Sequence, residues 1–321
     1  MKAIQVKEFG DPSVLALADL TDPAPGPGEV AIDVSHAAVG LVDVYLRQGL
    51  YRDRPGLAQP PYVPGLEVAG TVRALGAGVS GFTVGERVIA LSGNGTGGYA
   101  SVYIRHQDFV VSTEDYGIDP ALAVAVLPNA IMAHVALTRV ARMAKGESIL
   151  IHGAHGALAA TFPGIARGLG ASRVVGTVRT QRTHQLPYDQ IVDSADLARG
   201  LGEEKFDVII DPVGSAVRTQ SMNLLAPFGR LLLVGNASGD WEHSLPSNAI
   251  WYGNTVVAGF NAGGYLPAHP ELVRPAAEAA LAAVAAGLAN VELDILPLAD
   301  AAIAHERVEN HAAGGRLVLR I

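Results

Sequence analysis

The sequence contains no cysteine. Disulfide bonds, thiol nucleophiles and zinc sites with cysteine ligands are therefore excluded. Aromatic residues are also scarce, at 6% of 321 residues, whereas 49% are hydrophobic and 37 are glycine. A chain of this length can bury two cores, and its small and aliphatic residues favour an α/β protein in which helices pack closely against sheets.

Basic residues are few as well. There are 23 Lys and Arg against 31 Asp and Glu, so the formal net charge is −8. An acidic chain without a basic run is a poor partner for nucleic acid or an anionic membrane. No uninterrupted apolar run is long enough to span a membrane, and the first ten residues, MKAIQVKEFG, are too polar for a secretory signal. We therefore expect a cytoplasmic protein that acts on a small molecule and binds neither nucleic acid nor membrane.

The first 110 residues are rich in short β-type runs separated by turn signals. Examples are EVAIDVSHAAVG (29–40) and EVAGTVRAL (67–75), and only residues 41–48 form a helix candidate. After a predicted helix at 120–144 the pattern changes. Strands then alternate with helices, which is typical of an open parallel sheet. The expected strands lie at 148–152, 173–178, 190–193, 206–214, 230–235 and 255–260.

The C-terminal region starts with an alanine-rich helix at 274–289. A further helix and a terminal strand follow, and we expect that strand to return to the first domain. The chain therefore divides into a β-rich domain, residues 1–122 completed by 265–321, and an inserted α/β domain, residues 123–264.

The stretch after the strand 148–152 resembles a dinucleotide cradle. In such units a tight turn of small residues brings backbone N–H groups to a pyrophosphate at the start of a helix. Only His155 and Leu158 are bulky in this turn, which we call the phosphate turn (residues 153–158). A glycine pair alone also suits an ordinary strand–helix turn, but the second strand that follows favours the cradle. Its candidate cofactor-binding residues are Gly153, Ala154, His155, Gly156, Ala157 and Leu158.

Two arginines occupy the position that selects the cofactor. About 20 positions after the glycines, an acidic residue would bind the ribose hydroxyls of NAD. Here the position holds Arg179, with Arg182 nearby. Arginine suits the 2′-phosphate of NADP through charge-assisted, bidentate bonds, whereas the alternative is a pair of solvated loop arginines. We predict NADPH as the cofactor.

Pro163 falls where the helix of the cradle should run. Proline in a helix interior costs about 3 kcal/mol, because it lacks an N–H and clashes with the preceding turn. We expect the helix either to kink at Pro163 or to begin later than the motif implies.

Taken together, these segments resemble the medium-chain dehydrogenase/reductase superfamily, in particular its zinc-free quinone oxidoreductase (zeta-crystallin-like) branch. The resemblance implies a GroES-like catalytic domain formed by residues 1–122 and 265–321. It also implies a Rossmann-type, doubly wound NADP-binding domain at 123–264. It runs through MKAIQVKEFGDPSVL, GPGEVAIDV, DVYLRQGLY, VPGLEVAGTVRALGAGVSGFTVGERV, FDVIIDPVG, LLLVG and GGRLVLRI.

At two positions where zinc-bearing members of this superfamily have metal ligands, this sequence has residues that cannot bind zinc. Gly40 stands where zinc-bearing relatives have cysteine, and Leu66, before Glu67, stands where they have histidine. The structural zinc lobe is replaced by the short SGNGTGG at 92–98. For the histidines elsewhere, core or surface roles fit better than ligation, because their spacing does not suit a metal: His134, His152, His155, His305 and His311.

The resemblance implies that Tyr45 and Tyr51, six residues apart, line the substrate cleft. In related enoyl-thioester reductases the tyrosine that matches Tyr51 is the proposed proton donor. Packing at a core edge is the alternative role for such tyrosines. Gly40 and Met132 depart from the asparagine and threonine usual in the branch, and the segment between Arg182 and Tyr188 is shorter than usual. The two substitutions suggest an unusual, larger or more apolar substrate, or a chemistry other than simple quinone reduction.

We therefore expect an NADPH-dependent reductase of a quinone or of the C=C bond of an α,β-unsaturated carbonyl compound, working without metal. A pathway-specific enoyl reductase for a bulky or carrier-bound intermediate is the alternative enzyme. A cofactor-binding protein with little catalysis is the third possibility. Further residues expected to line the cofactor follow the later strands of the sheet: Val213, Gly214, Gly235, Asn236, Phe260 and Asn261.

The last strand of the parallel sheet also predicts the assembly. TVVAGF (255–260) is apolar on both faces, and as an exposed edge it would promote aggregation. In the resembling family such strands pair across a two-fold axis. We therefore expect a homodimer that forms through residues 255–260.

Overall fold

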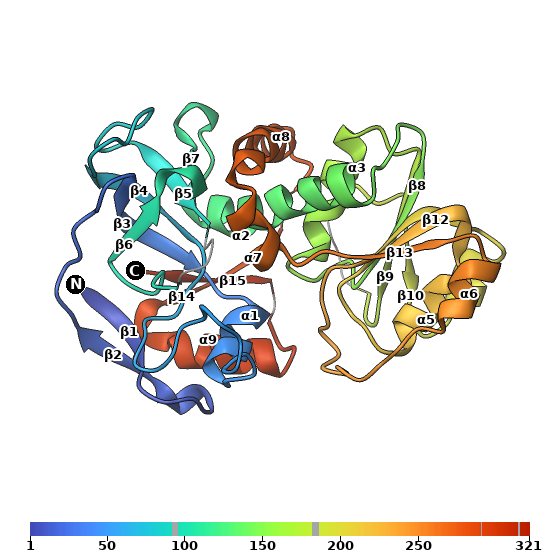
Figure 1. The fold of residues 1–321 in the computed structure, drawn as a ribbon, viewed down its shortest axis with the longest axis horizontal. Coiled ribbons are helices and arrows are strands. Elements are labelled where there is room, and N and C mark those ends of the chain that lie inside the picture. The colour runs from blue at the N-terminus through green and yellow to red at the C-terminus, as the bar shows by residue number, and fades with distance from the viewer. Residues whose placement is uncertain (92–95, 182–185, 290, 314) are drawn as a thin grey trace. The chain divides into compact units, whose positions relative to one another are not determined.

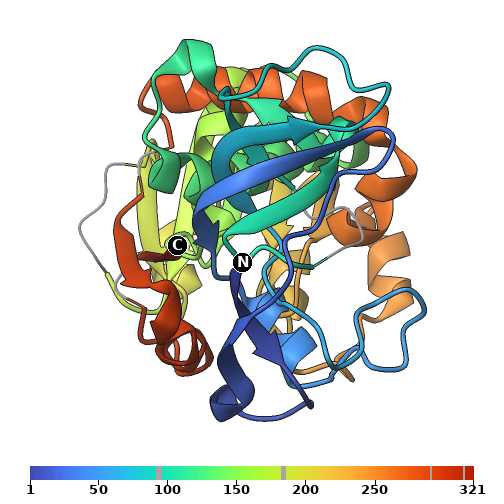
Figure 2. The same cartoon turned by 90° about the vertical axis from the view of Figure 1, so that its left-hand side faces the viewer.

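The computed structural model describes residues 1–91, 96–181, 186–289, 291–313 and 315–321. Its chain forms two compact units (Figure 1). The first unit comprises Met1–Pro128, Leu266–Ala277 and Val291–Ile321, and the second comprises Asn129–Tyr265 and Glu278–Asn290. Residues Glu278–Asn290, which include the later half of the alanine-rich helix, therefore group with the second unit, whereas the sequence pattern placed them with the first. Both chain termini belong to the first unit (Figure 2).

A seven-stranded sheet forms the frame of the first unit. Its order is β14-β15-β3-β4-β5-β7, and β6 pairs with β3. The terminal strand β15 pairs antiparallel with β3, with Val318 opposite Ala38, which confirms that the tail returns to this unit. A separate hairpin is made of β1 (Lys2–Val6) and β2 (Leu15–Asp19). The sheet strands are β3 (Glu29–Ala38), β4 (Val68–Leu75), β5 (Arg87–Ala90), β6 (Val102–His106), β7 (Val110–Ser112), β14 (Leu293–Pro297) and β15 (Arg316–Arg320).

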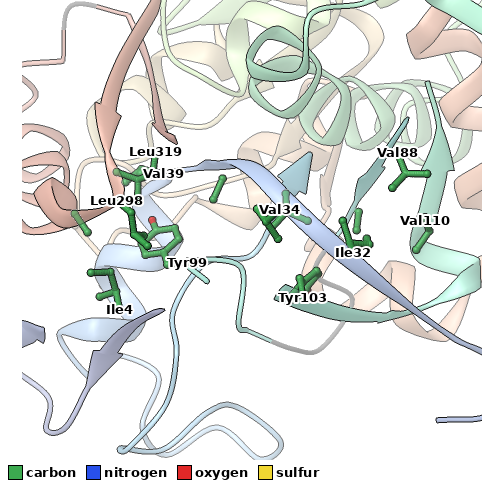
Figure 3. Close-up of a cluster of buried hydrophobic side chains, with 14 of the residues drawn as sticks. Ile4, Ile32, Val34, Val39, Val88, Tyr99, Tyr103, Val110, Leu298 and Leu319 are labelled. Carbon is green, nitrogen blue, oxygen red and sulfur yellow. The ribbon is translucent and has the colours of Figure 1, made fainter. Parts of the chain in front are cut away.

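The core of this unit is built from segments far apart in the sequence. Ile32 and Val34 of β3 belong to the same buried cluster as Tyr99 and as Leu298 and Leu319 of the C-terminal tail (Figure 3). Alternating apolar residues on β3 supply one side of this cluster, as expected for a strand with one buried face. The tail is thus part of the first unit's hydrophobic core.

The second unit contains a six-stranded parallel sheet in the order β10-β9-β8-β11-β12-β13. Numbered along the chain, this is the 3-2-1-4-5-6 order of the Rossmann fold. The predicted fold class, a doubly wound parallel sheet beside a β-rich domain, is confirmed. The strands are β8 (Ser148–His152), β9 (Arg173–Val178), β10 (Gln190–Asp193), β11 (Phe206–Asp211), β12 (Leu225–Leu233) and β13 (Val256–Gly259).

The helix expected at 120–144 is shorter than predicted. Regular α-helix α2 spans Pro120–Val135, and a wider π-type turn covers Ala136–Val140. Arg142 has a φ of 48°, which a continuing right-handed helix cannot contain. By length and composition alone, the segment Pro120–Val140 would be able to cross a membrane, but it is mostly buried within the protein, as core helices are.

The remaining helices are short except for the alanine-rich one. They are α1 (Leu41–Arg47), α3 (Phe162–Gly168), α4 (Leu197–Leu201), α5 (Ala216–Met222), α6 (Ser247–Tyr252), α7 (Ala262–Tyr265), α8 (Val273–Ala285) and α9 (Ala301–Glu309).

Candidate cofactor-binding site

The phosphate turn follows the first strand of the parallel sheet. Gly153 has a φ of 65°, a conformation that favours glycine, and its carbonyl accepts the N–H of Gly156 at 2.7 Å. A Cβ on Gly156 would lie only 3.0 Å from that same carbonyl oxygen. Gly156 and Ala157 are exposed. A turn of small, exposed residues at the carboxyl end of this strand allows a pyrophosphate to approach the backbone closely.

Neighbouring elements hold this turn on two sides. The N–H of Ala154 donates to the Thr177 carbonyl on β9 at 2.9 Å, and the side-chain amide of Asn129, on α2, donates to the Ala157 carbonyl at 3.2 Å. His155 and Leu158 are half-buried. These two hydrogen bonds tie the turn to β9 and α2.

The structure decides between the two outcomes expected for Pro163. Helix α3 begins at Phe162, after a short 3₁₀ turn at Ala159–Thr161, and Pro163 lies in its first turn. At that position a proline needs no N–H partner. The helix therefore starts late and does not kink.

Arg179 follows the last residue of β9 and is exposed. Because β9 pairs in parallel with β8, Arg179 lies at the same edge of the sheet as the phosphate turn. In the described part of the chain, no carboxylate lies within ion-pair distance of its guanidinium. Its partner in the sequence prediction, Arg182, lies outside the described residues.

The other predicted cofactor residues follow the later strands. Val213 and Gly214 follow β11 after one intervening residue, Pro212, and Gly235 and Asn236 follow β12 after Val234. Phe260 follows β13, but its side chain is 5% exposed and its ring packs edge-on against Tyr265, with centroids 5.8 Å apart. The Phe260 side chain is thus a core element, while Asn261 beside it is exposed.

His152, at the end of β8, has the core role expected for it. Its Nδ1 lies 3.0 Å from the Thr177 hydroxyl on β9, and its Nε2 lies 2.8 Å from the Ser221 hydroxyl on α5. Burial lowers the pKa of His152 to about 4, against the opposing charge of Asp211. A neutral imidazole therefore joins two strands and a helix beneath the phosphate turn.

Tyr45 and Tyr51 lie together in the first unit. Tyr45 is on α1, Tyr51 follows that helix, and their rings meet edge to face with centroids 6.1 Å apart. Both side chains are half-buried, and burial raises the pKa of each above its usual value of 10. The guanidinium of Arg54 lies over the Tyr51 ring, 4.9 Å from its centroid, and lowers that pKa in opposition to burial. Both hydroxyls are therefore hydrogen-bond donors at neutral pH.

The positions that bind zinc in related enzymes carry no donor side chains in this unit. Gly40 caps helix α1, and Leu66 is aliphatic. Glu67 forms an ion pair with Arg316, at 3.4 Å. Over the described ranges, no group of three or more His, Cys, Asp or Glu side chains could hold a metal ion. Residues 92–95 of the expected short lobe at 92–98 lie outside those ranges.

Sequence reasoning missed Asp43, a buried carboxyl on the same helix as Tyr45. Its Oδ2 accepts the N–H of Gly40 at 2.8 Å, so it caps the first turn of α1. Burial raises the pKa of Asp43 to about 7, while the Gly40 hydrogen bond and the Arg316 charge oppose the shift. The only signal in the sequence is an acidic residue three positions after a helix-starting glycine.

Two family models match the chain. The alcohol dehydrogenase GroES-like domain matches residues 26–115, and the zinc-binding dehydrogenase domain matches residues 169–319. A quinone oxidoreductase from Sus scrofa is 32% identical over 331 residues, which cover 99% of this chain and 97% of that protein.

Solved structures agree over the full length. A quinone oxidoreductase from Pseudomonas syringae pv. tomato DC3000 has a TM-score of 0.87 and 27% identity, and the match covers 100% of this chain and 99% of that chain. The Escherichia coli quinone oxidoreductase, solved in complex with NADPH, has a TM-score of 0.87 and 25% identity, with both chains covered completely.

Proposed function

Because the chain belongs to the quinone oxidoreductase family of the medium-chain dehydrogenase/reductase superfamily, we propose that it is an NADPH-dependent reductase of small molecules. Its substrate class is quinones or α,β-unsaturated carbonyl compounds. The observation that carries the proposal is the phosphate turn, in which Gly156 and Ala157 are exposed, with the exposed Arg179 at the same edge of the parallel sheet. The NADPH complex of the related Escherichia coli enzyme supports it.

The residues present fit NADPH. The backbone of Gly156 and Ala157 is accessible to the pyrophosphate, and Arg179 offers a bidentate site for the 2′-phosphate. The turns at Val213–Gly214 and Gly235–Asn236 would hold the nicotinamide half. When bound, NADPH supplies the hydride.

The substrate side of the proposal needs no metal. Gly40 and Leu66 do not fit a catalytic zinc, because neither side chain has a donor atom. A substrate carbonyl must then be polarised by hydrogen bonds, and the Tyr51 hydroxyl is the proposed donor to the oxygen where negative charge develops. Hydride addition to a conjugated carbon or a quinone needs less polarisation than addition to a simple ketone.

A second candidate is an enoyl reductase for a bulky or carrier-bound intermediate. Gly40 favours it, because a Cβ there would meet only Asp43 at 3.5 Å and Arg316 at 3.8 Å, so this glycine leaves space beside α1. Met132 adds a flexible apolar side chain where relatives have threonine.

The decisive experiment has two stages. Fluorescence titration of the purified protein with NADPH and NADH measures binding, and NADPH oxidation is then followed with a panel of quinones, small enones and enoyl thioesters. Turnover of quinones or small enones supports the first proposal, and turnover of thioesters alone supports the second. NADPH binding without turnover of any panel member would reject both and leave a cofactor-binding protein.

We also propose a cytoplasmic homodimer formed through β13. This strand is the last in the sheet order. Four large exposed side chains lie on it or on adjoining segments: Phe228, Trp251, Tyr252 and Val256. The backbone N–H of Phe228 donates to the carbonyl of Asn254, just before β13. Phe228 therefore lies beside the start of this last strand of the sheet.

A further inference from the structure

The last residue of β11, Asp211, is completely buried and shapes the turn that follows it. Its Oδ1 accepts the backbone N–H groups of Val213 and Gly214, each at 2.8 Å. A buried carboxylate needs such partners, because an uncompensated charge in the interior is strongly destabilising. The conformation of residues 212–214 therefore depends on this carboxylate.

Arg218, in the first turn of α5, links the Asp211 carboxylate to the turn that follows β12. Its Nε donates to Asp211 Oδ2 at 2.8 Å, and its Nη2 donates to the Gly235 carbonyl at 3.1 Å. The Arg218 side chain is only 13% exposed. One planar guanidinium thus contacts the turn after β11 through Asp211 and the turn after β12 directly.

The turn after β11 and the turn after β12 also contact one another directly. The N–H of Ser238 donates to the Val213 carbonyl at 2.8 Å. Gly214 has a φ of 85°, which favours glycine, and a Cβ there would lie 2.1 Å from Asn236 Oδ1, so a larger residue would displace the Asn236 side chain. The positions of Gly214, Gly235 and Asn236 are therefore set together, and the Arg218 side chain bonds across the pair of turns.

We propose that Arg218 is a positioning residue that holds both turns in the arrangement needed by the nicotinamide half of the cofactor. The proposal rests on the proposed NADPH-dependent function. In a doubly wound sheet each half binds one mononucleotide, and β11, β12 and β13 form the half opposite the phosphate turn and Arg179. Arg218 should therefore act on one half of the cofactor and leave the adenosine half unaffected.

Arg218→Met tests this assignment by equilibrium binding of NADPH and of 2′,5′-ADP, which carries only the adenosine half. We expect the Kd for NADPH to rise about tenfold, because displaced turns lose contacts to the nicotinamide half, and the Kd for 2′,5′-ADP to stay within about twofold. Arg199→Met is the matched control, since Arg199 is an exposed arginine of the same unit and its removal should change neither constant.

Removing Arg218 alone strands the buried Asp211 charge, so two further variants guard against misfolding. Asp211→Asn with Arg218→Met removes both charges and keeps a side-chain oxygen for the turn, and it should still lose NADPH affinity selectively. Arg218→Lys keeps the charge without the planar fork and should recover affinity only in part.

Each outcome has one meaning. Unchanged NADPH binding in a folded Arg218→Met protein, or equal weakening of both ligands, would overturn the positioning role. Failure of the wild-type protein to bind NADPH would instead reject the proposed function and this inference with it.

Discussion

The hydroxyl of Tyr99 lies 3.3 Å from Nε2 of His305, and both side chains are completely buried in the β-rich unit. Burial, helped by the positive charge of Arg47, lowers the pKa of His305 to about 3. In the same unit burial raises the pKa of Asp43 to about 7. The interior of this unit thus favours the neutral form of both groups, and this preference makes stability depend on pH in opposite directions for the acid and the base.

Asp43→Asn should become more stabilising as pH rises. The raised pKa of folded Asp43 means that its contribution to stability is complete below about pH 4 and is lost as pH rises through about 7. Asparagine keeps the oxygen that accepts the Gly40 N–H and cannot ionise. We expect the variant-minus-wild-type difference in unfolding free energy to be larger at pH 8 than at pH 5, by at most about 3 kcal/mol, because only about two pH units separate pH 5 from the folded pKa. Thermal denaturation at both pH values measures it.

His305→Gln is a control, because its effect on stability should depend on pH in the opposite direction to that of Asp43→Asn. The pKa of folded His305 is depressed, so wild-type stability falls as pH drops below about 6.5, where the unfolded chain takes up a proton. The difference in unfolding free energy between the variant and the wild type should therefore favour the variant more at pH 5 than at pH 8. A pH-independent difference for Asp43→Asn would show that this carboxyl titrates normally in the folded protein.

Gly164→Ala should destabilise the second unit. A Cβ at this position would lie 2.4 Å from the carbonyl oxygen of Leu288, so the backbone must shift, at a cost of about 1–3 kcal/mol. Gly168, one turn later on α3, has nothing within 4 Å of its Cβ position. Gly168→Ala should therefore raise the melting temperature slightly, because alanine restricts the unfolded chain. A lower Tm in both variants would place the effect in α3 itself and not in the contact with Leu288.

The sequence predicted the elements whose signals are local. Strands 148–152 and 173–178 have the predicted bounds, because each is a short apolar run between turn residues. Strand β14 was missed, since it is a half-exposed run stabilised by its parallel pairing with β15, and pairing partners are not visible in a pattern. The end of α2 was also misplaced, because the left-handed conformation of Arg142 has no signal in this sequence.

The same distinction applies to the site. The phosphate turn and the two tyrosines follow from spacing and family resemblance. The Arg218–Asp211 contact was not predictable, because it joins a strand end to a helix seven residues later and the two residues meet only in the tertiary structure. Phe260 was predicted among the cofactor residues from its place after β13, but apolar residues at strand ends also complete cores, and its side chain is buried.

Val256→Lys should convert the proposed dimer into a monomer. Val256 is 46% exposed on β13, and a lysine on an edge strand opposes strand pairing. Light scattering coupled to gel filtration at micromolar concentration should give a dimer mass for wild type and a monomer mass for the variant. Val84→Lys, at an exposed valine of the other unit, should remain dimeric. A wild-type protein that is monomeric at that concentration would rule out the assembly.

Arg179→Ala should change cofactor preference. Loss of a charge-assisted contact to the 2′-phosphate, about 1.5–3 kcal/mol, should raise the Kd for NADPH roughly tenfold or more. The Kd for NADH should stay nearly unchanged, because NADH lacks that phosphate. Isothermal titration with both cofactors measures the ratio, and Arg199→Ala controls for the loss of one exposed positive charge in the same unit. Equal losses for NADPH and NADH would mean that Arg179 supports the fold.

Tyr51→Phe tests the proposed chemistry. If the Tyr51 hydroxyl donates to the substrate oxygen as negative charge develops, its removal should slow hydride transfer more than it weakens binding. Burial raises the pKa of Tyr51 above 10, so the hydroxyl keeps its proton at neutral pH and can act only as a donor. A lost donor of this kind typically costs about 100- to 1,000-fold in turnover, and a substituting water would reduce the loss to about tenfold. We therefore expect kcat on enones to fall at least about tenfold, with unchanged NADPH affinity and Tm.

Tyr116→Phe, at an exposed tyrosine of the same unit, should leave kcat unaltered. Unaltered kcat in Tyr51→Phe as well would transfer protonation to Tyr45, whose ring meets that of Tyr51 edge to face, or to solvent.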